Sequence, residues 1–325
     1  MATSAAVSAP PPTGARALVL RLCNGDEVAR LITLVFASSI LLVTIALVYE
    51  LWVTSALARH KFGFGFLTSS MWDPVTGQFG ALPFIYGTVI TSVIALLIAV
   101  PLGVGAAIFL SELAPARLSS TFTFFIELLA AVPSVIYGVL AMFTLVPLMR
   151  DYVDPFLKKT LGFLPIFSGT IFGYGYLTAG AILAIMTLPF IVSISREALL
   201  EVPVEQREAA LALGATRWES TWQAVVPWAR LGIFGSIFLA LARALGETMA
   251  VTMVIGNDPS IHASLFAPGY AIAAVIANEF TEATGDLYLQ SLVGLGLVLF
   301  LLTIVINALA RLLIIATTRR GSAHP

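Results

Sequence analysis

Two ionisable residues stand four positions apart inside an otherwise uncharged, apolar stretch of the chain. Arg243 and Glu247 are the only charged residues of the segment 231–257. If this segment is a helix, positions i and i+4 lie on one face, so the two side chains could pair with each other. Alternatively, the guanidinium could bind a tetrahedral oxyanion through two parallel donors, with the carboxylate competing for it. Residue types and spacing therefore indicate either a structural ion pair or an anion site.

Other residues that could carry chemistry give weaker signals. The three histidines lie far apart, no motif has metal-ligand spacing, and Cys23 is the only cysteine. Glu127 lies in a second apolar run, where it could line a path or pair with a polar group. No lysine follows a glycine, which excludes a Walker A nucleotide loop. We expect no catalytic residue, metal or cofactor, so an active transporter of this kind would need a separate ATPase subunit.

The overall composition places these residues in a membrane. Of the 325 residues, 59% are hydrophobic and 11% are charged, whereas soluble domains carry about 25% charged residues. The formal net charge of −1 provides no basic field for nucleic acid. The sequence therefore predicts an all-α protein whose partner is the lipid bilayer.

Charged residues separate six apolar runs that are long enough to cross a bilayer as helices. These runs are 31–49, 83–110, 118–149, 170–194, 231–257 and 287–310. The expected organisation is a cytoplasmic tail (1–30), a first transmembrane helix (31–52), a periplasmic loop (53–80), a five-helix domain (81–316) and a cytoplasmic tail (317–325).

One further uncharged run, 259–278, contains the helix-breaking pair Pro268 and Gly269. We favour a short helix entering the outer leaflet over a seventh span. With the N-terminus inside, eleven Lys and Arg residues fall in inner segments and five in outer ones. Because basic residues favour the cytoplasmic side, both termini are predicted to be cytoplasmic.

The inner segment 196–229 carries signals for two helices of its own. Pro203 suits a helix start, Gly214 suits a left-handed helix end, and Thr216 with Glu219 forms a capping-box pattern. Pro227 is expected to end the second helix. This hairpin could lie on the membrane surface or form a docking element for a cytoplasmic partner.

The hairpin resembles a known motif. Glu208, Ala209 and Ala210 are followed after three residues by Gly214 and after nine more by Ala224-Val225-Val226-Pro227. This pattern resembles the EAA loop of type I binding-protein-dependent ABC transporter permeases, although that family has Ile and Leu where this chain has Ala224 and Val226. The resemblance covers about residues 80–316. It implies a coupling helix seated in a cleft of the ATP-binding subunit, with Glu208, Ala209, Ala210 and Gly214 in the coupling role.

The stretch 243–257 is similar to the signature of PstC-type phosphate permeases, a family in which the residues matching Arg243 and Glu247 are associated with phosphate translocation. The resemblance implies a multi-pass subunit of the cytoplasmic (inner) membrane. It also implies its partners: a second permease of the PstA type, two ATP-binding subunits and an external phosphate-binding protein. The alternatives are an ABC permease for another oxyanion, such as molybdate or sulfate, and a stand-alone ion-coupled transporter. The latter would not need a structured EAA hairpin.

Overall fold

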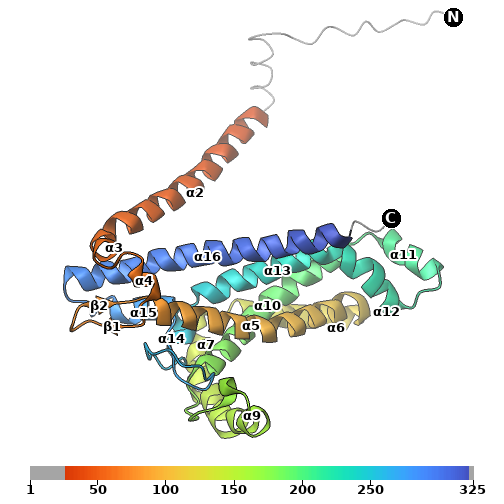
Figure 1. Cartoon of the computed structure of the whole chain (residues 1–325). Helices are drawn as coiled ribbons and strands as arrows, with labels where there is room; N and C mark the ends of the chain where they lie inside the picture. Colours follow the sequence, from red (N-terminus) through yellow and green to blue (C-terminus); the bar gives the residue numbers. More distant parts are fainter. Residues whose placement is uncertain (1–25, 322–325) are drawn as a thin grey trace, which may run out of the picture. The chain divides into compact units, whose positions relative to one another are not determined.

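The computed structural model describes residues 26–321, which form helices over most of their length (Figure 1). Internal contacts divide the chain into two units, one ending at Val53 and one beginning at Thr54. The first unit contains nearly all of helix α2 (Asp26–Thr54), whose apolar window is not buried against protein, as suits a helix surrounded by lipid. Most of the predicted tail 1–30, including Cys23, lies outside the described residues, as do residues 322–325 with His324.

Within residues 26–321, six helical stretches are long and apolar enough to cross a membrane, which confirms the predicted number. They are Val28–Thr54, Leu82–Leu113, Ser134–Leu161, Tyr176–Leu200, Arg217–Gly246 and Asp286–Leu312. The last belongs to α16 (Asp286–Gly321), which continues as a helix beyond the boundary predicted at 316.

The third crossing is interrupted, so the prediction of one helix over 118–149 is wrong. α6 (Ala116–Ala130) ends before Pro133, whose extended ψ of 139° and missing N–H prevent the helix from continuing. Helical structure resumes in α7 (Ser134–Leu140), η2 (Ala141–Leu145), α8 (Val146–Leu148), η3 (Met149–Val153) and α9 (Asp154–Leu161).

The core of the second unit forms where α5 (Leu82–Ile108) packs along α10 (Tyr176–Leu200), with α13 (Val226–Gly246) beside both. The α5–α10 contact depends on small residues. A Cβ at Gly103 would lie 2.7 Å from Cγ2 of Ile191, so a larger residue would push the helices apart. A π-helical turn, η1 (Phe109–Leu113), extends α5 towards the end of the bundle that carries the hairpin.

The predicted hairpin is present, with α11 (Val204–Ala212) followed by α12 (Arg217–Ser220). Its second helix does not end at Pro227, and this part of the prediction is wrong. The π-helical turn η5 (Thr221–Val225) lets the Val226 N–H bond to the Thr221 carbonyl, and Pro227 then stands in the first turn of α13. The first turn of a helix tolerates a residue without an N–H, so the helix runs on into the fifth span.

Short elements occupy the opposite end of the second unit (Figure 1). They are α3 (Ala56–Phe62), α4 (Gly65–Thr68), η4 (Pro165–Phe167), α14 (Met249–Thr252), α15 (Ile272–Glu279) and an antiparallel pair, β1 (Trp72–Asp73) with β2 (Gln78–Phe79). The run 259–278 is irregular until α15 begins. At about 1.5 Å per residue α15 is far shorter than a bilayer. The run therefore forms no seventh helical span, and its entry into the outer leaflet stays a prediction.

Candidate functional site

The turn of the hairpin adopts the geometry that its sequence predicts. Gly214 has φ +90°, and the Ala215 N–H bonds back to the Ala210 carbonyl, which satisfies one of the last carbonyls of α11. Thr216 and Glu219 form the reciprocal capping box that starts α12. The two helices are thus fixed by local interactions on both sides of the turn.

The surface of α11 is open among the described residues. Glu208 and Ala209 are exposed, Ala210 is half-buried, and Leu213 is 90% exposed. An uncovered leucine is typical of a surface that a partner covers, because a large apolar side chain gains free energy by leaving water. Glu208, Ala209 and Ala210 belong, with Gly214, to the residues expected to serve coupling, and this role stays a prediction.

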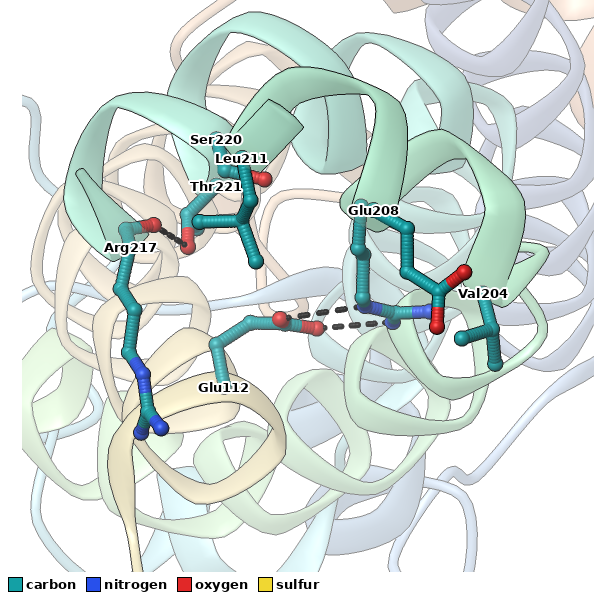
Figure 2. Close-up of a pocket in the computed structure, with 8 residues that line it drawn as sticks. Glu112, Val204, Glu208, Leu211, Arg217, Ser220 and Thr221 are labelled. Carbon is teal, nitrogen blue, oxygen red and sulfur yellow. Dashed lines mark hydrogen bonds and ion pairs between the residues drawn. The ribbon is translucent and has the colours of Figure 1, made fainter. Parts of the chain in front are cut away.

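A bidentate ion pair that sequence reasoning missed lies beneath this surface. Nη2 and Nε of Arg207 in α11 donate to the two carboxylate oxygens of Glu112 in η1, at 2.8 and 3.2 Å. A cavity of about 280 Å³ lies beside the pair. Figure 2 shows Glu112 of η1 facing Glu208 and Val204 of α11, which line this cavity. The pair spans 95 residues, so no local spacing could have indicated it.

Arg243 lies in the last turn of α13, not in the middle of a helix as predicted, because α13 ends at Gly246. The guanidinium carbon sits 4.5 Å from the ring centre of Phe190 in α10, a cation–π contact. The guanidinium therefore stands at the contact between α13 and α10.

No acceptor satisfies Arg243. Its Nε is buried and has no hydrogen-bond partner in the described part of the chain, and no carboxylate there forms an ion pair with it. A buried donor is normally hydrogen-bonded, so a half-buried guanidinium whose Nε has no acceptor can bind an anion. The C-terminal end of a helix favours a cation as well, because the carbonyls there carry partial negative charge.

Glu247 does not share a helical face with Arg243, so the predicted intrahelical pair is not formed. Glu247 has an extended ψ of 131° after the end of α13. Its carboxylate accepts from the Ala250 N–H at 3.4 Å, at the start of α14. An unsatisfied N–H at a helix start attracts a nearby carboxylate, and this local bond replaces the expected pairing.

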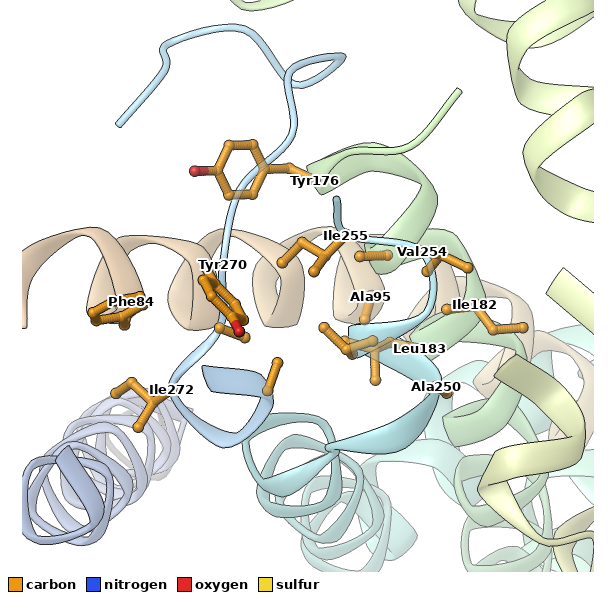
Figure 3. Close-up of a cluster of buried hydrophobic side chains, with 14 of the residues drawn as sticks. Phe84, Ala95, Tyr176, Ile182, Leu183, Ala250, Val254, Ile255, Tyr270 and Ile272 are labelled. Atoms are coloured by element: carbon orange, nitrogen blue, oxygen red, sulfur yellow. The ribbon is translucent and has the colours of Figure 1, made fainter. Parts of the chain in front are cut away.

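The chain around Glu247 is firmly packed. Ala250 and Val254 belong to the buried cluster of Figure 3, with Leu183 of α10 and Ala95 of α5. Glu247 therefore stands on a rigid segment beside Arg243. Within the residues that the structure describes, no group of three or more His, Cys, Asp or Glu side chains could hold a metal ion.

Comparisons with known proteins agree on one family. Residues 99–319 match the family described as binding-protein-dependent transport system inner membrane component. The phosphate transport system permease protein PstC of Mesorhizobium japonicum is 48% identical over 311 residues, which cover 94% of this chain and 95% of that protein. PstC of Xylella fastidiosa is 48% identical over 262 residues, covering 79% and 81%.

A solved structure shares the fold. It is a bacterial ABC transporter involved in the import of the acidic polysaccharide alginate, which is 17% identical, has a TM-score of 0.53, and is matched over 90% of this chain and 98% of that one. The matched family covers the hairpin and the last four spans, and relatives aligned with 94% and 79% of the chain are 48% identical to it. The chain therefore belongs to the binding-protein-dependent transport system inner membrane components and to their PstC group.

Proposed function

We propose that this chain is the transmembrane permease subunit of an ATP-binding-cassette importer that carries inorganic phosphate across the cytoplasmic membrane. Phosphate is the substrate named for relatives that align with 94% and 79% of the chain. The observation in this structure that supports an anion path is the guanidinium of Arg243, buried at Nε and without a counter-ion among the described residues.

Arg243 would contact the anion in this proposal. A guanidinium offers two parallel N–H donors that match two oxygens of a phosphate, and the ring of Phe190 fixes its plane. Glu247, on the neighbouring turn, supplies a negative charge that discourages the anion from staying bound. Binding that is favourable but not too tight is what a transport path requires.

The hairpin would couple transport to ATP hydrolysis. Glu208, Ala209, Ala210 and Gly214 form the turn and the exposed side of α11, which would seat in an ATP-binding subunit. The full assembly would hold two such subunits, a second permease of the PstA type and an external phosphate-binding protein. The support is the membership in the binding-protein-dependent family and the uncovered apolar surface of α11.

Deleting only this chain from a cell that expresses the complete transporter tests the function. Phosphate uptake at low external concentration should be lost and should return when the intact chain is supplied again. Unchanged uptake of phosphate, together with loss of sulfate or molybdate uptake, would favour the rival substrate.

Replacing Gly214 with alanine should weaken docking of the ATP-binding subunits about fivefold. A Cβ at this position has open space around it, so the cost arises from the backbone alone. A left-handed φ costs an L-residue about 1 kcal/mol, which corresponds to this factor in an affinity. Co-purification titrations would measure it. Gly65→Ala, at an equally open glycine without positive φ, should leave docking unchanged, and equal affinities for both variants would contradict the prediction.

The hairpin and the Lys and Arg distribution also give an orientation that labelling can test. In a variant without Cys23, a cysteine at Ser260 should react with an impermeant thiol reagent added outside intact cells, because loop 258–286 is expected to face the periplasm. A cysteine at Gln206 on α11 should react only after the membrane is opened. The reverse pattern would overturn the topology.

A further inference from the structure

Arg207 connects three elements at the hairpin end of the bundle. It belongs to α11, it pairs with Glu112 in the extension of α5, and it also reaches the end of α10. There Nη2 donates to the Leu199 carbonyl at 2.7 Å and Nη1 donates to the Val202 carbonyl. The last carbonyls of a helix have no intrahelical donors, so Arg207 serves as a cap for α10 as well as an ion-pair partner.

The pair is sheltered from water. The side chains of Arg207 and Glu112 retain 21% and 11% of their exposure. A sheltered charge that loses its partner remains uncompensated, so neither residue can move away from the other at low cost. Other charged side chains of the hairpin, Glu208 and Arg217 among them, are exposed. Arg207 thus ties α11 to the extension of α5 and to the end of α10.

We propose that Arg207 is the positioning residue that transmits movement of the docking surface to α5 and α10. It precedes Glu208 directly, so a shift of α11 imposed by an ATP-binding subunit would pull on Glu112 and on the end of α10 together. The inference rests on the proposed function, because it takes α11 to be the docked helix. In this proposal Arg207 neither contacts the ATP-binding subunit nor touches phosphate.

α10, the helix whose end Arg207 caps, also carries Phe190, whose ring faces the proposed anion site at Arg243. Phe190 lies on α10 nine residues before Leu199, about 14 Å along the helix axis. A helix moves as a rigid rod over this length, so a displacement at Leu199 reaches the Phe190 ring that lies against Arg243. Arg207 therefore links the site of ATP-driven movement to the site of anion contact through one continuous element. Such a link is demonstrated only by measured coupling.

The test is the number of phosphate ions imported per ATP hydrolysed by the complete complex in proteoliposomes. Arg207→Gln and Glu112→Gln are each expected to lower this ratio about tenfold, a typical size for coupling between two sites, while the ATP-binding subunits stay bound. The double variant should be no worse than the lower single variant, because both remove the same contact. Arg207→Lys keeps the charge but not the fork and should retain an intermediate ratio.

Arg117→Gln is the matched control, because it removes an exposed arginine at the start of α6 and should leave the ratio unchanged. A normal ratio in assembled Arg207→Gln and Glu112→Gln complexes would overturn the proposal, as would lower yield with a normal ratio in the complexes that remain. If Arg207→Gln does not assemble, the ratio measured with Glu112→Gln tests the proposal. The glutamine amide fills the same space as the Glu112 carboxylate and still accepts a hydrogen bond. If the intact complex hydrolyses ATP without importing phosphate, the proposed function fails instead. The same ratio is then measured with sulfate or molybdate, whichever is carried.

Discussion

Arg243→Gln is expected to abolish phosphate uptake, by about 100-fold or more, in a complex that still assembles. Glutamine is shorter than arginine and offers no charge and no pair of parallel donors. A hydrogen bond to a charged group contributes about 1.5–3 kcal/mol, so losing two of them removes a factor of this size. Assembly should persist because Arg243 makes no hydrogen bond or ion pair in the described part of the chain that the substitution would break. The measurement is initial uptake rate, normalised to assembled complex.

Arg230→Gln provides the control for this variant. It removes a positive charge from the same helix, about 20 Å away along its axis, and should leave uptake near normal. Arg243→Lys keeps the charge without the planar fork and should be partly active.

The rival explanation, a structural ion pair between Arg243 and Glu247, makes a different forecast. Under it, replacing both residues by leucine would restore assembly and transport. A double Arg243→Leu, Glu247→Leu variant that assembles and imports phosphate normally would exclude the anion-site explanation. The position of the Glu247 carboxylate, bonded to the Ala250 N–H, already argues against a permanent pair.

Glu208→Lys is the second large effect, and it should release the ATP-binding subunits from the membrane complex. The carboxylate stands exposed on α11, so it is available to a basic side chain of a partner. Reversing the charge turns an attraction into a like-charge contact that costs several kcal/mol, which corresponds to at least about a 100-fold loss of affinity. Co-purification of the ATP-binding subunits with this chain would measure the loss.

Gln206→Lys is the matched control for Glu208→Lys. It also places a lysine at an exposed position of α11, but two residues earlier and therefore on a different face of the helix. Normal recovery of the ATP-binding subunits with Glu208→Lys, or equal loss with Gln206→Lys, would show that Glu208 has no specific docking role.

Local sequence signals predicted the local structure well. The left-handed turn at Gly214 and the capping box at Thr216 depend on residues within one or two helical turns, and both are confirmed. The predicted number of spans is also confirmed among residues 26–321, although the third span is Ser134–Leu161 and not the run 118–149. Pro227 was misjudged because the π-helical turn before it depends on how the hairpin enters the fifth span. A proline in the first turn and a proline that ends a helix look alike in sequence.

The site was predicted less completely, for a physical reason. Arg243 and Glu247 were recognised because charges in apolar runs are rare, but their separation depended on where α13 ends. The chain could either continue the helix or use the Glu247 carboxylate to begin α14, and tertiary packing around Ala250 decides between them. Arg207 and Glu112 meet only after two spans fold together, and Phe190 meets Arg243 in the same way.

The most direct measurement is ATP-dependent uptake of radiolabelled phosphate by proteoliposomes that contain the complete complex, with sulfate and molybdate as competitors. We expect phosphate to accumulate only with ATP and the external binding protein, competitors to have little effect, and Arg243→Gln to abolish the signal while ATP-binding subunits remain attached. Accumulation of sulfate or molybdate in place of phosphate, or full phosphate uptake by Arg243→Gln, would contradict the account.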